Sequence, residues 1–268
     1  MTLSEIENLI QILHEDNHII VIVKPRGIPS QADKSGDDDL LTLLKEYIKQ
    51  KYNKQGNVYC GLVHRLDRPT GGVMVFAKTD KAAARLSEQF KNSEITKKYF
   101  AIVNGKPRDK IGRYESYLRK DERNNIVKNH VGKVENSKLA ILEYKILDVV
   151  KNPAYELESP KQTKYKNLDV YEEENPEEEN LLSLLDINLV TGRSHQARVQ
   201  LSALGCPIYG DHKYGKSEGN QLSLWAYSLS FTHPTKQEVM SFKVFPPTEE
   251  KPWNLFPMDR HIHIARPD

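Results

Sequence analysis

The stretch HRLDRPTGGVMVFAK, from His64 to Lys78, holds the side chains best suited to chemistry. Asp67 lies between Arg65 and Arg68, ahead of a Pro-Thr-Gly-Gly break and an apolar run. A carboxylate flanked by fixed positive charge at a loop-to-strand junction tends to stay ionised and can be aimed at a substrate. The same residue types occur in ordinary surface loops, so the charge pattern alone leaves a solvated structural turn as the competing interpretation.

A second group of polar side chains follows much later in the chain. Residues 191–194 (TGRS) are expected to turn the chain into a helix that ends at Gly205, a C-cap glycine. On that helix Ala197 would face the core. His195 and Arg198 would then lie three residues apart on an adjoining face, near the N-terminal end.

Tyr99 lies in a strand predicted over residues 97–105, where it shares one face with Ala101 and Val103. A tyrosine in such a row is usually a core residue, so its spacing gives it no chemical role. Residues 113–138 are polar and basic and are expected to form hairpins over a surface. A solvated face is the ordinary interpretation, but contacts to a polyanion backbone would fit there.

The elements that must position these residues follow from apolar periodicity and capping signals. Ser4 and Glu7 match a capping box for a short helix over 5–13. Further helices are predicted from Asp37–Asp39 to about residue 52 and from Thr79 or Asp80 to about residue 92. Strands are predicted over residues 18–23, 58–63, 72–77, 97–105, 138–150, 181–190, 222–231 and 238–245.

Composition excludes several classes of protein. With 268 residues and 38% apolar content, the chain can bury a sizeable core. No apolar run is long enough to span a membrane and the N-terminus is acidic, so a cytoplasmic location is expected. Cys60 and Cys206 lack metal-ligand spacing and are predicted to be buried thiols. His261 and His263 have no further ligands nearby in the sequence, so no metal site is predicted.

The net charge of +2 conceals an uneven distribution. Residues 156–180 contain nine acids and three bases, which leaves +8 on the rest of the chain. The acidic segment has too little apolar content to order itself and is expected to be a flexible insertion at about 159–179. The basic remainder is compatible with a polyanionic partner, although many cytosolic proteins carry a similar excess.

Four separated motifs, taken in order, resemble the RluA-type pseudouridine synthases of rRNA and tRNA. They are ILHEDNHIIVIVKPRGI at 12–28, HRLDRPTGGVMVFAKT at 64–79, KKYFAIVNG at 97–105 and LVTGRSHQARVQLSALGCPIYGDHKYG at 189–215. The resemblance implies a mixed α/β fold with a central, largely antiparallel sheet, flanking helices and a catalytic cleft. A single catalytic domain over 1–268 is expected. Some family members carry a small RNA-binding domain ahead of the catalytic one, but only about a dozen residues precede the first motif here, so no separate N-terminal RNA-binding domain is expected.

The resemblance also implies roles for individual residues. Asp67 would be the catalytic aspartate, Tyr99 the tyrosine that stacks on the uracil, and Arg198 the arginine paired with the aspartate. Arg65 resembles the arginine that holds the extruded nucleotide. The remaining motif residues expected to bind substrate are His64, Arg68, Thr70, Arg193, His195 and Gln196.

Two positions depart from the family pattern. The family commonly has Ser where Gly71 stands and His where Trp225 stands. Neither position is thought to do the chemistry. The departures therefore put local loop geometry in doubt rather than activity.

The implied reaction breaks the glycosidic bond of a flipped-out uridine, turns the uracil and rejoins it through a ring carbon, so no cofactor or metal is expected. Asp67 could attack the anomeric carbon or remove a ribose proton, and the sequence does not choose between them. The expected partner is rRNA or tRNA, bound by a monomer.

Two other functions stay open from the sequence. A non-catalytic RNA-binding or ribosome-assembly factor could use the same fold, although it would not need Asp67, Tyr99 and Arg198 together. A glycoside hydrolase would normally need a second acid, which the motif does not offer.

Overall fold

The computed structural model describes residues 1–153, 180–215 and 219–261. Its helices are α1 (Leu3–Leu9), α2 (Leu40–Lys51), α3 (Asp80–Lys91), α4 (Gln196–Ala203) and α5 (Met258–His261), with a 3-10 turn η1 (Trp253–Leu255). Its strands are β1 (Gln11–Glu15), β2 (Ile19–Lys24), β3 (Gly61–Leu62), β4 (Gly71–Ala77), β5 (Thr96–Asn104), β6 (Ile111–Asp121), β7 (Ile126–His130), β8 (Lys138–Lys151), β9 (Leu181–Leu189), β10 (Leu224–Thr232) and β11 (Val239–Lys243).

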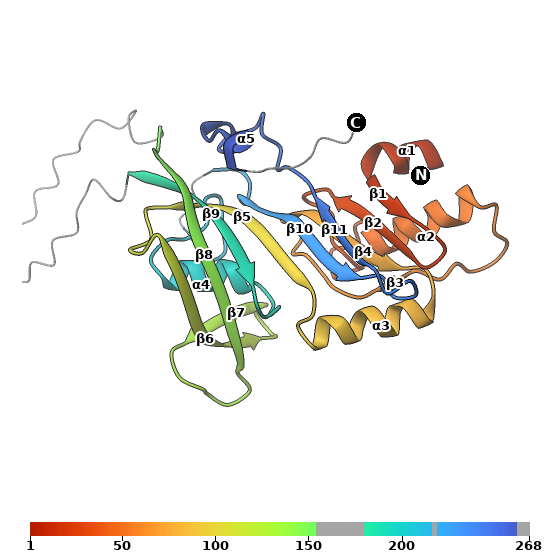
Figure 1. Ribbon diagram of the computed structural model, residues 1–268, viewed down its shortest axis with the longest axis horizontal. Coiled ribbons are helices and arrows are strands. Elements are labelled where there is room, and N and C mark those ends of the chain that lie inside the picture. The colour runs from red at the N-terminus through yellow and green to blue at the C-terminus, as the bar shows by residue number, and fades with distance from the viewer. Residues whose placement is uncertain (154–179, 216–218, 262–268) are drawn as a thin grey trace, which may run out of the picture.

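All the strands of the described chain belong to one sheet, in the order β1-β2-β4-β10-β5-β9-β8-β6-β7 (Figure 1). β3 adds to β4, and β11 adds to β10. Every pairing is antiparallel except the short β4–β10 contact. The predicted mixed α/β fold with a largely antiparallel sheet and flanking helices is therefore confirmed.

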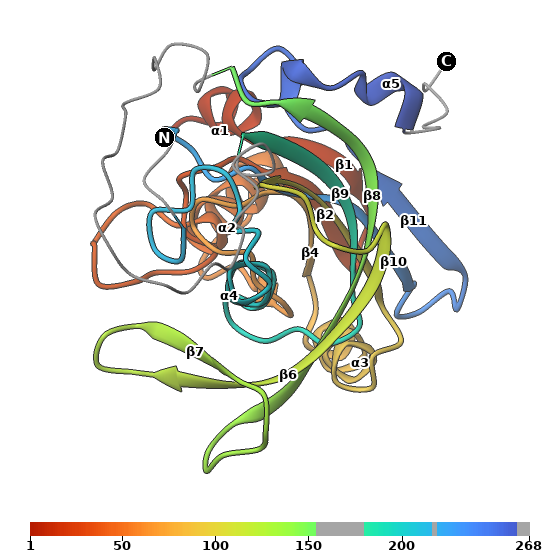
Figure 2. The same ribbon diagram turned by 90° about the vertical axis from the view of Figure 1, so that its left-hand side faces the viewer.

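Helices cover both faces of the sheet. α1 and α2 pack on one face of β2 and β4, and α4 packs on the same side of β5, β8 and β9. Viewed end-on, α4 lies inside the curve of the sheet (Figure 2). On the other face, α3 covers β2 and β4, while η1 and α5 cover β5, β9 and β10.

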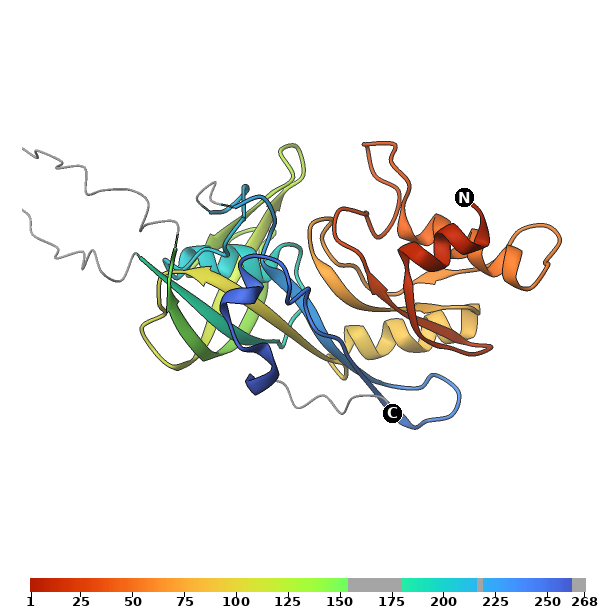
Figure 3. The same cartoon turned by 90° about the horizontal axis from the view of Figure 1, so that it is seen from above.

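The sheet has two halves, one containing β1, β2 and β4 and the other running from β10 to β7. They meet along a narrow seam between β4 and β10 (Figure 3). Only two residue pairs, Trp225 with Gly71 and Ala226 with Gly72, join these strands. Gly72 has φ +122°, and a Cβ there would lie 2.2 Å from the carbonyl oxygen of Ala226. Only glycine permits both this backbone conformation and this close approach.

The two departures from the family pattern contact each other at this seam. A Cβ on Gly71 would lie 2.3 Å from the ring of Trp225, which is far inside van der Waals contact. The absence of a side chain at position 71 is thus what makes room for the large indole at position 225.

Most predicted elements match the structure, but the predicted helix over 5–13 is wrong. The helix ends at Leu9, and residues 11–15 form β1, which pairs with β2 through Gln11 and Val23. Pairing with a buried neighbouring strand outweighs the helical spacing of the apolar residues. The capping box is formed by Thr2 and Glu5 rather than by Ser4 and Glu7.

One further predicted strand is shorter than expected, whereas the predicted helix caps and buried cysteines are confirmed. The predicted strand over 58–63 is reduced to Gly61–Leu62, which pair with the end of β4. The predicted caps Asp39 and Thr79 accept hydrogen bonds from Thr42 N and Ala82 N. Both cysteines are buried free thiols, as predicted. The acidic insertion at 159–179 and His263 lie outside the described residues.

Candidate active site

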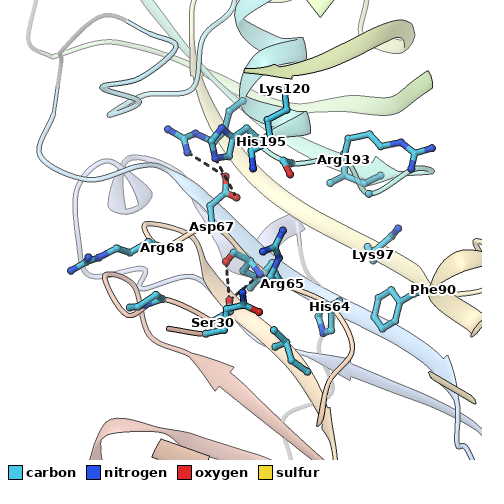
Figure 4. A pocket seen from close by; sticks show the side chains of 18 of the residues that line it. Ser30, His64, Arg65, Asp67, Arg68, Phe90, Lys97, Lys120, Arg193 and His195 are labelled. Carbon is cyan, nitrogen blue, oxygen red and sulfur yellow. Dashed lines mark hydrogen bonds and ion pairs between the residues drawn. The ribbon is translucent and has the colours of Figure 1, made fainter. Parts of the chain in front are cut away.

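A cavity of about 1050 Å³ opens beside the seam, and the Asp67 loop forms part of its wall (Figure 4). Most of its walls come from residues 29–33, 62–69 and parts of 90–99 and 189–198, and Lys120, Asn125 and Lys213 complete them. Among its lining residues the cations greatly outnumber the acids, which are Asp33 and Asp67 alone. The cations are Arg65, Arg68, Lys91, Lys97, Lys120, Arg193, Arg198 and Lys213. Such a wall favours a polyanionic ligand.

The Asp67 loop is held in place by Lys24, at the end of β2. Its fully buried ammonium donates to the carbonyl oxygens of Pro25 (2.9 Å), Arg68 (3.1 Å) and Thr70 (2.9 Å). Burial lowers the pKa of Lys24 to about 7, partly opposed by the charge of Asp67. The loop backbone is thereby fixed from below, which leaves the Asp67 side chain free to face the cavity.

Asp67 faces a guanidinium from α4. Its Oδ2 accepts a hydrogen bond from Arg198 Nη1 at 3.2 Å. Arg198 is in turn held by Asp211, which is 1% exposed and accepts from Nε at 2.8 Å and from Nη2 at 2.7 Å. This fork-shaped pairing fixes the plane of the guanidinium and therefore the direction from which it meets Asp67.

Asp211 stays ionised in this arrangement. Burial alone would raise the pKa of its carboxyl group, but the hydrogen bonds and charge of Arg198 outweigh burial and hold the pKa below its ordinary value. The backbone N–H groups of Lys213 and Tyr214 also donate to its Oδ1.

His195 lies on the other side of Asp67, with Nε2 3.9 Å from Oδ1. The hydroxyl of Tyr214 accepts from Val127 N at 2.9 Å and lies 2.6 Å from His195 Nδ1. The contact with the Tyr214 hydroxyl therefore holds the imidazole ring in place beside Asp67. Burial lowers the pKa of His195, although Asp67 opposes this, so the neutral form is favoured.

Tyr99 comes from β5, between β10 and β9 in the sheet. Its ring packs against the core under α2 and against the core under α4, so it lies where the two halves meet. Burial, and then the charge of Asp67, raise the pKa of its hydroxyl. The phenol stays protonated and presents a neutral aromatic surface to the cavity.

His64 and Arg65 line the cavity on the strand side of Asp67. His64 Nε2 accepts from Val75 N at 3.1 Å, and its ring stacks on Phe90 with centroids 4.6 Å apart. Burial, and then the charge of Lys97, lower the pKa of His64 to about 3, so it is a neutral wall residue. Arg65 is exposed, and its guanidinium can reach a ligand.

The other predicted binding residues divide into two groups. Arg68 and Arg193 line the cavity, and Arg68 also pairs with Asp37 on its outer side. Thr70 and Gln196 are buried and do not line it. Gln196 instead accepts from Thr191 Oγ1 and Arg193 N and so fixes the turn that precedes α4.

Sequence reasoning assigned no role to Lys24, Asp211, Tyr214 or Lys97. The available signals were a lysine ending an apolar strand just before Pro25, and an acid in the Gly-rich 210–215 loop. In the part of the chain that the structure describes, no three His, Cys, Asp or Glu side chains gather as a metal would require. No helix there is long and apolar enough to cross a membrane.

The sequence model of the RNA pseudouridylate synthase family matches residues 18–203, which is more than half of the chain. The chain therefore belongs to the RNA pseudouridylate synthase family.

Several curated relatives are similar in sequence. The ribosomal large subunit pseudouridine synthase C of Rickettsia felis is 33% identical over 212 residues, which cover 77% of this chain and 56% of that protein. The ribosomal large subunit pseudouridine synthase D of Borreliella burgdorferi is 33% identical over 228 residues, 82% of this chain and 60% of that protein. An RNA pseudouridine synthase of Aquifex aeolicus is 32% identical over 256 residues, 90% and 71% of the two chains. The chain thus spans little more than half the length of the first two.

Solved structures support the same fold. The human RNA pseudouridylate synthase domain containing 4 superposes with a TM-score of 0.67 at 23% identity, covering 91% of each chain. The human RNA pseudouridylate synthase domain containing 1 gives 0.65 at 20% identity, covering 90% of this chain and 85% of that one.

Proposed function

We propose that this protein isomerises uridine to pseudouridine in RNA, with Asp67 as the essential residue. The observation that carries the proposal is the position of the Asp67 carboxylate, which faces Arg198 and His195 in a basic cavity that also contains the Tyr99 ring. The family membership supports the same reaction.

Each side chain has a task in this reaction. Arg198 orients the carboxylate, because its Nη1 donates to Asp67 Oδ2 while Asp211 fixes the plane of the guanidinium. Tyr99 offers an aromatic surface that offsets part of the stacking a flipped-out uracil loses. Arg65, exposed beside Asp67, can bind the extruded nucleotide. These interactions need neither a redox centre nor an external group, because the reaction only rearranges the nucleoside.

Asp67 can act in two ways, and both remain open. Its carboxylate can attack the anomeric carbon and form a covalent intermediate, or it can remove the neighbouring ribose proton to give a glycal. In either case the imidazole of His195 lies beside the carboxylate, with Nε2 3.9 Å from Oδ1.

We also propose the setting in which the protein works. The names of the bacterial relatives favour rRNA of the large subunit as the first substrate to test, with tRNA second. A cytoplasmic location would follow from a ribosomal substrate. We expect a monomer with a single catalytic domain. Neither metal nor cofactor should be needed, because the isomerisation only rearranges the nucleoside.

The test is tritium release from transcripts labelled at C5 of uridine, since pseudouridine formation exchanges that hydrogen. Wild-type protein should release tritium from rRNA transcripts, and Asp67→Asn should release none above background. Asp33→Asn is the matched control, because Asp33 is the other carboxylate among the lining residues and its hydrogen bonds are to the nearby Ser35 in its own turn.

The outcomes separate the alternatives. Undiminished release by Asp67→Asn would sink the catalytic assignment. Loss of activity in both variants would point to a two-carboxylate mechanism instead. RNA binding without any tritium release from rRNA or tRNA would favour a non-catalytic RNA-binding factor.

A further inference from the structure

Lys97 occupies the part of the cavity beyond His64, away from the contact between Asp67 and Arg198 (Figure 4). The side chain is only 9% exposed, yet it lines the cavity. Within the described residues, no side chain or backbone group forms a hydrogen bond or ion pair with its ammonium. Its neighbour Lys98, by contrast, lies 3.7 Å from the carboxylate of Asp186.

A buried cation without a counter-ion is costly, and proteins usually pair or neutralise such groups. Burial lowers the pKa of Lys97, and the charge of Arg193 lowers it further. Among the described residues, no salt bridge with an acid compensates the positive charge of Lys97 and Arg193 at this end of the cavity. An anion supplied by a ligand would remove the cost.

Arg193 adds a second cation to the same end of the cavity. Its Nε donates to the carbonyl oxygen of Leu139 at 2.9 Å, and its backbone N–H donates to the Gln196 side chain at 3.0 Å. The guanidinium is thus oriented by the backbone of β8 rather than by an acid. Gly192 lies beside Lys97, where a Cβ would be 3.5 Å from Nζ, and both residues line the cavity.

We propose that Lys97 and Arg193 form a phosphate-binding subsite that holds the RNA backbone next to the flipped-out nucleotide. Lys97 and Tyr99 are two residues apart on β5, so their side chains share one face about 7 Å apart along the strand. The strand that carries the base platform would then also fix the neighbouring phosphodiester, which sets the register of the RNA. This subsite deepens the proposed function and depends on it for the flipped nucleotide.

The test measures RNA binding in the Asp67→Asn background, so that catalysis does not intervene. The probe is a fluorescent RNA stem-loop with uridines in its loop, titrated at a series of salt concentrations. Lys97→Met should weaken binding roughly ten-fold at low salt and reduce the slope of log K against log salt by about 0.7 to 0.9, the loss of one phosphate contact. Lys97→Arg should restore the slope.

Lys98→Met is the matched control, because it removes the same charge from the opposite face of the same strand. It should leave the salt slope unchanged. Thermal unfolding is a second readout, since removing an uncompensated buried charge should leave Tm unchanged or raise it. A merely structural lysine would instead lower Tm when replaced and leave the slope unaltered.

An unchanged salt slope for Lys97→Met, or absence of binding by the parent protein, would overturn the subsite. Failure of the isomerase proposal is recognised separately by absent tritium release from wild-type protein. Active wild-type protein with an unaltered slope for Lys97→Met would reject the subsite alone.

Discussion

Replacing Asp211 with Asn should lower the turnover number although Asp67 itself is unchanged. Asp211 Oδ1 accepts from Arg198 Nη2 and from the backbone N–H groups of Lys213 and Tyr214, while Oδ2 accepts from Arg198 Nε. An Asn with its oxygen in the Oδ1 position keeps the first three bonds. Its amide nitrogen then meets the Nε–H of Arg198, and two donors face each other.

The magnitude follows from burial. Asp211 and Arg198 are 1% and 6% exposed, so solvent does little to compensate the lost charge and hydrogen bond. Breaking one side of a buried ion pair typically costs about 3 to 5 kcal/mol, and the retained bonds place Asp211→Asn near about 3 kcal/mol. The turnover number should fall about 100-fold, because a displaced Arg198 no longer meets Asp67 in a fixed geometry.

The Asp211→Asn experiment pairs urea unfolding with tritium release on the same protein. Asp186→Asn is the control, since Asp186 is a partly buried acid outside the cavity, and Asn can still accept from the Tyr227 hydroxyl. Because the pKa of Asp211 is held below its ordinary value of 3.8, its stabilising effect is present above that pH and is lost on further acidification. Asp211→Asn should lack that loss. Wild-type turnover in Asp211→Asn would refute the idea that Arg198 must be held in place.

Three further outcomes are expected. Gly71→Ser should lower the free energy of unfolding by about 1 to 3 kcal/mol, because its side chain would overpack against Trp225. Adding Trp225→His should restore that free energy. Urea titrations measure both effects. The pKa of Lys24 in the folded protein is about 7, below its usual 10.5. The unfolded chain therefore binds more protons between these pH values, and the free energy of unfolding of the wild type should rise with pH there. Unfolding titrations at several pH values should show no such rise for Lys24→Met. Deleting residues 159–179 should leave tritium release largely intact, because Asn152 N donates to Asn180 O at 2.8 Å and closes the strand pair at the base of the segment; loss of activity with a retained fold would contradict this.

Local patterns in the sequence predicted most of the sheet. The apolar runs at β2, β4 and β5 are buried, and the caps Asp39 and Thr79 stand where capping preferences put them. The first helix failed because its apolar residues also suit an edge strand. β1 pairs with β2 in a local hairpin, and the hydrogen bond from Asp16 N to Ile19 O closes a turn that helical spacing alone does not take into account.

In the site, too, some contacts were predicted from the sequence and others were not. The hydrogen bond between Arg198 and Asp67 agrees with what the family motifs implied. The support beneath it was not foreseen, because Lys24 acts on carbonyl groups 44 and 46 residues away in sequence. Asp211 likewise contacts Arg198 only because the loop that carries it folds back onto α4. Long-range partners of this kind have no signature in local spacing.

The contact between Gly71 and Trp225 also couples the two positions for protein engineering. In the observed conformation a Cβ at position 71 would lie 2.3 Å from the indole ring, so a side chain there requires the ring to move or to be replaced by a smaller one. Substitutions at the two positions should therefore be designed together rather than one at a time.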